Sequence, residues 1–231
     1  MITIRKGTER GETRYGGWLD SRHTFSFGDY QDRRYHQFRA LRAINDDRIA
    51  PGGGFPTHPH RDMEVLTCVL SGALEHSDSM GNGDVISAGE WQAMTAGTGV
   101  AHSEFNPSDE EGVHLLQIWL LPDRRGHAPT YQQKAFTDGE KFDAWKLVAS
   151  PDGSDGSLRI QQDARVYQTK LAGAGAVRHE LKPGRAAFVH VATGSATVNG
   201  TPLVAGDAVA IEDEPVVVAQ GAGEVLLFDL A

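Results

Sequence analysis

Glycine and proline interrupt this sequence at short intervals along almost its whole length. The 231 residues include 27 glycines and 10 prolines, and few stretches between them could hold a helix of several turns. Glycine is costly inside helices and strands, and proline breaks helices. No run of about 18 apolar residues occurs, so we expect no membrane-spanning helix. The spacing therefore favours many short strands joined by tight turns.

The segments between these turns have the composition of strands. Each is short and rich in apolar or β-branched residues, and turn pairs such as Asn199-Gly200 bound several of them. The clearest predicted strands lie at 64–70, 91–94, 114–121, 166–171, 188–191 and 224–230. Strands of this kind, with no long helix between them, predict an all-β sandwich or barrel.

A weak internal repeat divides the chain into two halves. Gly72 ends a Val-Leu-Ser-Gly sequence, and Gly194 ends a Val-Ala-Thr-Gly sequence 122 residues later. Gly89 and Gly206 follow Ala88 and Ala205 in a second matching pair, 117 residues apart. The smaller second offset indicates shorter loops in the second copy. We predict a first β-barrel at 1–122, a polar linker at 123–139 and a second barrel at 140–231.

Charge and cysteine content exclude several classes of protein. The 22 Lys and Arg residues against 31 Asp and Glu give a net charge of -9, which argues against nucleic acid as the main partner because phosphate binding needs a basic surface. The single cysteine, Cys68, excludes an internal disulfide and a Cys-rich metal site, and its apolar neighbours predict burial. Without a signal-peptide pattern after Met1, we expect a cytoplasmic protein with no membrane partner, which can bury its own core as a monomer.

Histidines and carboxylates gather at two places in the first half. His58, His60 and Glu64 follow a glycine-rich turn, and His102 and Glu104 lie about forty residues farther on. Because strand side chains alternate, the residues of each set share one face if their segment is extended. Three imidazoles and a carboxylate on a β scaffold suit a first-row transition metal. We therefore predict one metal site in the first barrel.

The second half provides an internal comparison for this site. The offset of 122 residues places Glu180 and Lys182 where His58 and His60 stand in the first half, and no histidine follows His190. A merely structural feature would be expected in both copies. The histidine pair occurs in the first copy and not in the second. This supports the metal site in the first barrel and predicts a second barrel without metal ligands.

Several other side chains are assigned from their surroundings. His76 and Asp78, in a strand-like segment, are candidates to line the cavity beside the metal. The aromatic residues of segment 18–30 are expected to cover the barrel core rather than touch a substrate. The remaining histidines lack a partner at ligand spacing and are predicted to be structural or exposed: His23, His36, His114, His127, His179 and His190.

Several motifs carry a resemblance to a known family. Gly52, His58, His60, Glu64 and Gly72 resemble the first cupin motif, although the gap after Glu64 is one residue longer than usual. Segment 89–106 resembles the second cupin motif without its usual proline. With segments 17–28, 58–64 and 95–104, the chain is similar to bacterial pirin-family bicupins. The resemblance covers nearly the whole chain and implies two tandem cupin barrels of the jelly-roll, double-stranded β-helix type.

The resemblance also bears on the ligand set. Cupins in general use the carboxylate of the first motif, here Glu64, whereas pirins use the carboxylate two residues after the last histidine, here Glu104. Both are present, and spacing alone does not choose between them. Following the closer family, we expect His58, His60, His102 and Glu104 to bind the metal, with Glu64 as an alternative ligand or a residue that supports the ligands. The resemblance implies one divalent ion per chain, Fe(II) first, although Cu, Ni, Co, Mn or Zn would also fit these ligands.

Several pirin-family proteins are similar to flavonol dioxygenases that cleave quercetin. The resemblance therefore implies a metal-dependent dioxygenase that takes a flavonol and O2 and forms a depside and carbon monoxide. Glu104, or else Glu64, is the candidate general base for the 3-hydroxyl group of the flavonol. Resemblance to eukaryotic pirins implies the main alternative, a non-catalytic metal-binding protein with a regulatory or redox-sensing role. A third possibility is a cupin of another class, such as an isomerase or a small-ligand binder.

Overall fold

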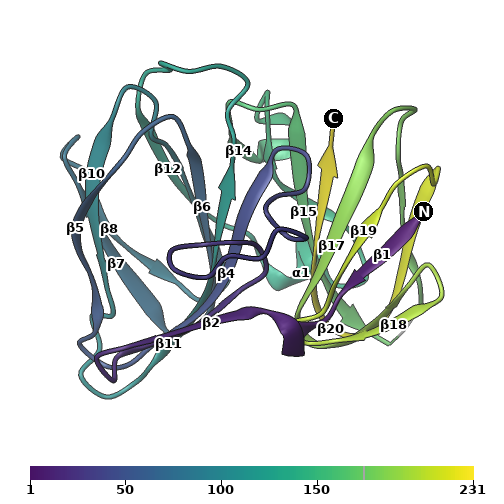
Figure 1. The fold of residues 1–231 in the computed structure, drawn as a ribbon, viewed down its shortest axis with the longest axis horizontal. Coiled ribbons are helices and arrows are strands. Elements are labelled where there is room, and N and C mark those ends of the chain that lie inside the picture. The colour runs from purple at the N-terminus through teal and green to yellow at the C-terminus, as the bar shows by residue number, and fades with distance from the viewer. Residues whose placement is uncertain (174) are drawn as a thin grey trace.

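The computed structural model describes residues 1–173 and 175–231, and strands dominate it (Figure 1). In these two ranges the helical segments are single short turns: η1 (Gly7–Glu9), α1 (Asp138–Lys141) and η2 (Ser154–Gly156). None of the helices found there is long and apolar enough to cross a membrane. The predicted all-β class is confirmed, and so is the division into two barrels.

Two sheets that face each other form the N-terminal barrel, on the left in Figure 1. In spatial order, the seven-stranded sheet contains β12 (Thr130–Ala135), β9 (Glu90–Thr95), β6 (Glu64–Ser71), β11 (Val113–Leu120), β4 (Leu41–Ile49), β3 (Leu19–His23) and β2 (Gly11–Tyr15). The four-stranded sheet contains β5 (Gly54–His60), β10 (Val100–Phe105), β7 (Ala73–Asp78) and β8 (Gly83–Ser87).

One nine-stranded sheet curls into the C-terminal barrel, on the right in Figure 1. Its main path contains β1 (Ile2–Arg5), β19 (Ala208–Ile211), β17 (Ala186–Val198), β20 (Val216–Leu230), β15 (Ala164–Ala172), β13 (Lys146–Ser150) and β14 (Leu158–Arg159). Two short strands join this path: β16 (Val177–Glu180) beside β20, and β18 (Thr201–Val204) beside β17.

Two strands differ from the predicted boundaries between the barrels. β1 falls within the predicted first barrel, at 1–122, yet it pairs with β19 of the C-terminal barrel, with Ile4 opposite Val209. β12 falls within the predicted linker, at 123–139, yet it pairs with β9 of the N-terminal barrel. In each case the added strand covers a sheet edge whose backbone groups need partners. Local composition does not reveal such distant pairing.

Equivalent turns in the two barrels confirm the internal repeat. Gly72 and Gly194 both have positive φ angles, 73° and 69°, and a Cβ atom at either would lie within 3 Å of a backbone oxygen. The carbonyl of Gly72 accepts a hydrogen bond from the amide of Ala88, and the carbonyl of Gly194 accepts one from the amide of Ala205. The sequence pattern therefore reflects a turn that only glycine can form in this space.

The largest buried apolar cluster joins the two barrels. Strands β6 and β11 lie between the cavity of the N-terminal barrel and the C-terminal sheet, so both of their faces are covered and their sequences are almost continuously apolar. Trp91 on β9 donates a hydrogen bond from Nε1 to Oε1 of Gln168 on β15, at 2.8 Å. Cys68 is completely buried in this cluster, as predicted.

Truncation of Phe228 tests how strongly this cluster stabilises the fold. The ring is fully buried in the cluster that joins the barrels. We expect Phe228→Ala to lower the free energy of unfolding by about 3–5 kcal/mol, because it removes apolar contacts and leaves a cavity. Urea unfolding followed by fluorescence measures the change. Val204→Ala, at a side chain that is 59% exposed, is the control and should change stability by less than about 0.5 kcal/mol. Equal, small effects of both substitutions would contradict this assignment.

Candidate metal centre

Pairing between β5 and β10 brings three histidines together. His102 lies directly opposite His58, and His60 follows on the same strand, opposite Val100. The two strands approach closely at Gly54, where a Cβ atom would lie 2.4 Å from the carbonyl oxygen of Glu104. A β-bulge then shifts the register between His102 and Glu104. Bulges of this kind re-aim side chains next to functional sites.

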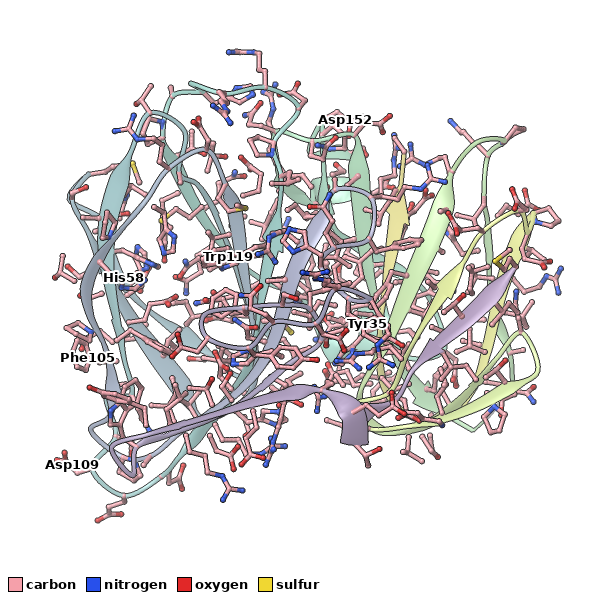
Figure 2. All side chains as sticks on the ribbon, in the orientation of Figure 1. Tyr35, His58, Phe105, Asp109, Trp119 and Asp152 are labelled. Atoms are coloured by element: carbon pink, nitrogen blue, oxygen red, sulfur yellow. The ribbon has the colours of Figure 1, made fainter. Side chains whose placement is uncertain are left out.

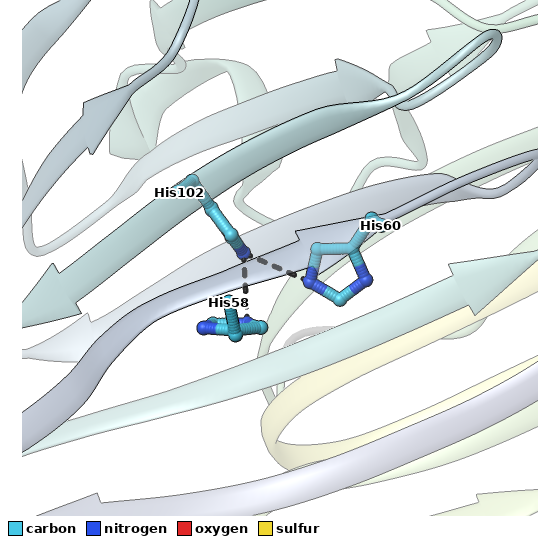
Figure 3. Close-up of side chains that lie close together, drawn as sticks. All are labelled: His58, His60 and His102. Carbon is cyan, nitrogen blue, oxygen red and sulfur yellow. Dashed lines mark hydrogen bonds between the residues drawn. The ribbon is translucent and has the colours of Figure 1, made fainter.

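The ring nitrogens of these three histidines converge on one point (Figure 3). The Nε2 atom of His102 lies 2.9 Å from Nε2 of His60 and 3.1 Å from Nε2 of His58. A metal–nitrogen bond of about 2.1 Å would place two nitrogens about 3.0 Å apart if the bonds stand at right angles. The spacing therefore fits three neighbouring positions around a six-coordinate ion, with further positions open.

Protonation also suits metal binding. His58 donates from Nδ1 to the carbonyl of Pro56 at 2.9 Å, which leaves the lone pair of Nε2 directed at the other histidines. Burial, with the neighbouring imidazoles, lowers the pKa of His60 to about 4 and that of His102 to about 2. Both are therefore neutral near pH 7, the form that binds a metal.

Glu104 lies beside this cluster as a buried carboxylate. Its Oε2 atom accepts a hydrogen bond from Nε2 of Gln117 at 2.8 Å, and its Oε1 atom has no hydrogen-bond partner. One of its oxygens lies within 4.8 Å of ring nitrogens of His102 and His76. Burial raises the pKa of Glu104 to about 7, and the nearby Asp47 adds to the rise. An unpartnered buried oxygen is costly, and a metal ion or a proton would satisfy it.

Glu64 lies apart from the histidines. It begins β6 in the other sheet, opposite Thr95, and its Oε2 atom accepts hydrogen bonds from the Thr95 hydroxyl and the Gln161 amide. Positions 58, 60 and 64 were expected to share one face if their segment is extended, but the chain turns between β5 and β6 at Asp62, where φ is 49°. Glu64 belongs to neither group of described side chains that could hold a metal.

His76 and Asp78 lie behind His102 and are absent from the lining of the cavity described below, which differs from the prediction. Both side chains are fully buried. Nδ1 of His76 lies 3.4 Å from Nδ1 of His102, and Nε2 of His76 lies 3.2 Å from the Asp78 carboxylate. If Nδ1 of His102 and Nε2 of His76 each carry a proton, Nδ1 of His102 donates to Nδ1 of His76. Nε2 of His76 then donates to the Asp78 carboxylate. This chain holds His102 in the tautomer that presents Nε2 to the metal.

His76→Phe tests that chain while keeping a ring at this position. The His76 ring stacks on Tyr131 at a centroid distance of 4.7 Å, and phenylalanine preserves the stacking but not the nitrogens. We expect metal affinity to fall about 10-fold or more, because residues that orient ligands contribute at that level. Competition against a chelator of known affinity measures the change. Unaltered affinity would show that the chain does not orient His102.

A cavity of about 340 Å³ adjoins His58, His60 and Glu104 inside the N-terminal barrel. Figure 2 labels His58 and Trp119, which border it from opposite sheets. Its size falls within the range of small-molecule sites. A larger open groove of about 810 Å³ runs past Trp18 and Arg48, and none of the three clustered histidines lines it.

Sequence reasoning missed several residues of this cavity. Phe27 borders it, although the aromatic segment 18–30 was expected to cover the core, as Phe25 does. His23 also borders it, although it was predicted to be structural or exposed. Polar residues at alternate positions of predominantly buried strands are the available signal for the others: Asn45, Asp47 and Gln117.

The other histidines make structural contacts or face solvent. His114, His127 and His179 each bind a nearby aspartate through Nε2. His190 is fully buried, and His36 is exposed. Among the residues that the structure describes, the C-terminal barrel contains no group of three side chains that could hold a metal.

Comparison with known families matches both barrels. The family model described as Pirin matches residues 5–120. The model described as Quercetinase C-terminal cupin domain matches residues 147–230. Together these models cover most of the chain, and they support two cupin-type barrels in the order predicted.

Individual proteins resemble the chain over its whole length. It is 47% identical to a protein named quercetin 2,3-dioxygenase from Escherichia coli strain K12, covering 100% of this chain and 99% of that protein. A pirin-like protein of Caulobacter vibrioides is 39% identical over 93% of this chain and 94% of its own length. The solved structure of YhhW from Escherichia coli superposes with a TM-score of 0.95 at 47% identity, covering 100% of this chain and 98% of that one. A second structure, bacterial pirin YhhW in complex with nickel(II), has a TM-score of 0.94 at 46% identity, covering 100% and 99%.

Proposed function

Since this chain belongs to the pirin family, we propose that it is a metal-dependent dioxygenase that cleaves flavonols such as quercetin with O2 to a depside and carbon monoxide. The observation that carries the proposal is the convergence of His58, His60 and His102 beside an enclosed cavity and a buried carboxylate. The names of its relatives indicate a quercetin 2,3-dioxygenase-like oxidoreductase. Flavonol and O2 are thus the proposed substrates.

His58, His60 and His102 would hold a divalent ion, with Glu104 as the fourth ligand. The spacing of the nitrogens and the unpartnered Oε1 of Glu104 both fit such an ion. We propose Fe(II) as the native ion, because imidazole and carboxylate are borderline to hard ligands. Nickel is a second candidate, since the solved structure of the bacterial pirin YhhW is a complex with nickel(II). When bound, the metal would supply Lewis acidity toward a substrate oxygen and a route for electrons toward dioxygen.

Glu104 is the group placed to take the proton from the 3-hydroxyl of the flavonol. Burial raises the pKa of the Glu104 carboxyl group while no metal is bound, and a general base works best when its pKa lies near the operating pH. Gln117 fixes the carboxylate by donating to Oε2, and Trp119 donates from Nε1 to Oε1 of Gln117 at 3.3 Å. This arrangement fixes Oε2 and leaves Oε1 for the metal, so the carboxylate would take the proton as Oε1 exchanges the ion for it.

Aromatic side chains line part of the cavity. Phe27, Phe55 and Trp119 border it together with the histidines. These rings match the flat, apolar body of a flavonol and exclude water from the reacting end. A metal that served only as a redox sensor would need no aromatic cavity beside it, so this feature favours catalysis over the regulatory alternative.

Oxygen uptake tests the proposal directly. Metal-free protein is loaded with one equivalent of Fe(II), or of Ni(II) in a parallel sample, and mixed with quercetin in an oxygen electrode. We expect one O2 to be consumed for each quercetin, with carbon monoxide and the depside as products, and no uptake by metal-free protein. Metal binding without oxygen uptake for any flavonol would overturn the proposal and favour the regulatory alternative.

A further inference from the structure

Polar side chains form two rows across the cavity face of strands β3, β4 and β11. Ser21 lies opposite Asp47, and His23 lies opposite Asn45, in the pairing of β3 with β4. On the other side of β4, Asn45 lies opposite Gln117, which orients Glu104. All of these side chains border the cavity. The row through His23 and Asn45 therefore leads to Glu104. Among the described residues, Asp47 and Ser21 make no hydrogen bond to Glu104 or to the three clustered histidines.

Asp47 differs from its neighbour Asp46 in its partners. Asp46 faces the opposite side of the strand, where it pairs with Arg10, Arg48 and His114. Asp47 is 2% exposed, and its one side-chain donor is Ser21, which donates from Oγ to Oδ1. A carboxylate accepts up to about four hydrogen bonds. Asp47 therefore has acceptor capacity that the protein does not use.

The cavity contains no positive side chain to balance Asp47. Among the described residues that border it, none is a lysine or an arginine. Burying a carboxyl group is costly unless donors satisfy it. A ligand with neutral hydroxyl donors would satisfy it.

A continuous aromatic wall connects the histidine cluster to this end of the cavity. The ring of His60 contacts Trp119 with centroids 5.1 Å apart, Trp119 contacts Phe27 at 4.9 Å, and Phe27 stacks on His23 at 5.3 Å. His23 is held in place because Nε2 contacts the Thr13 hydroxyl and Nδ1 contacts Oδ1 of Asn45, each at 2.8 Å. Such a wall suits a flat polycyclic ligand that reaches from the metal to the polar rows.

We propose that Asp47, oriented by Ser21, is a specificity-determining residue that accepts hydrogen bonds from a phenolic hydroxyl group other than the reacting 3-hydroxyl. The site then prefers neutral polyhydroxylated flavonols over flavonols that carry the 3-hydroxyl alone. The identity of the ligand as a flavonol rests on the proposed function, while the preference for hydroxyl donors rests on the surroundings of Asp47.

The test compares two ligands in anaerobic binding titrations of the metal-loaded protein. Quercetin carries hydroxyl groups on both outer ring systems, and 3-hydroxyflavone carries the 3-hydroxyl alone. We expect Asp47→Ala to weaken quercetin binding about 10-fold, the level expected when a hydrogen bond to a buried carboxylate is lost, and to change 3-hydroxyflavone binding less than twofold. Metal content should stay at the level of the unmodified protein. Asp109→Asn, on the exposed surface, is the control and should change neither affinity.

Other outcomes overturn the inference. Equal changes in affinity for both ligands, or no change for either, would show that Asp47 does not bind the additional hydroxyl groups of quercetin. If Asp47→Ala fails to fold, Ser21→Ala replaces it and should reduce the preference for quercetin in the same direction. A lack of preference in the unmodified protein also overturns the inference.

Oxygen uptake by the same samples separates this inference from the proposed function. A preference for quercetin that depends on Asp47, without oxygen uptake, would sustain the subsite and overturn the dioxygenase proposal. Normal oxygen uptake with a preference that Asp47→Ala leaves unchanged would overturn the subsite alone.

Discussion

His58→Ala is expected to abolish metal retention and flavonol oxidation together. The Nε2 atom of His58 is one of three that converge, and its Nδ1 proton is held by Pro56. Loss of this ligand leaves His60, His102 and Glu104, a smaller set that we expect to hold a divalent ion too weakly to retain it through purification. We expect metal content to fall from about one per chain to less than about a tenth, and quercetin-dependent oxygen uptake to fall at least 100-fold, since even residues that only orient ligands contribute 10–100-fold.

His36→Ala provides the matched control, because His36 is exposed and lies outside the metal groups. Its metal content and activity should equal those of the unmodified protein. Elemental analysis and an oxygen electrode supply the two readouts. Since His58 is only half-buried, its replacement should leave the fold intact, and a thermal unfolding curve checks this. Full metal content in the His58 variant would contradict the assignment of the ligands.

Glu104→Gln is expected to lower kcat/KM for quercetin by about 10²–10⁴-fold, the usual contribution of a general base. Glutamine has almost the same shape, so the cavity should keep its form, but the amide cannot take a proton at neutral pH. It is also a weaker metal ligand than a carboxylate, so we expect some loss of metal affinity. Activity is therefore measured at metal concentrations that saturate the variant.

The same substitution at Glu64 separates the two carboxylates. Glu64→Gln makes the same chemical change at a carboxylate that lies away from the histidines and is hydrogen-bonded to Thr95 and Gln161. We expect the metal content and kcat/KM of this variant to stay within about threefold of the values for the unmodified protein. Any loss should appear in the stability of the fold. The reverse result, with activity lost in Glu64→Gln and kept in Glu104→Gln, would identify Glu64 as the carboxylate of the site.

Much of the site follows from short stretches of sequence. His58 and His60 stand two residues apart, as do His102 and Glu104, and the strand period of two places each pair on one face without any tertiary information. The turns at Gly72 and Gly194 are likewise local, because a positive φ angle and the close backbone limit those positions to glycine. For these features, residue type and spacing are sufficient.

The choice between the carboxylates needed the register between strands. Glu64 and Glu104 are equally compatible with the spacing of the motifs. The turn at Asp62 sends Glu64 into the seven-stranded sheet, whereas pairing of β5 with β10 keeps Glu104 beside His102. Register is set by pairing across the sheet, and a shift of one residue would reverse every side chain.

The amino-acid sequence alone determined the all-β class, the duplicated barrel and the residue types that can hold a metal, because turn chemistry and strand alternation act over a few residues. The tertiary structure alone decided that β1 crosses to the C-terminal barrel, that β12 completes the N-terminal sheet, and that Ser21 and Asp47 meet on the wall of the cavity. These features depend on contacts between residues far apart in the chain, and strand pairing and burial select them when the whole molecule folds.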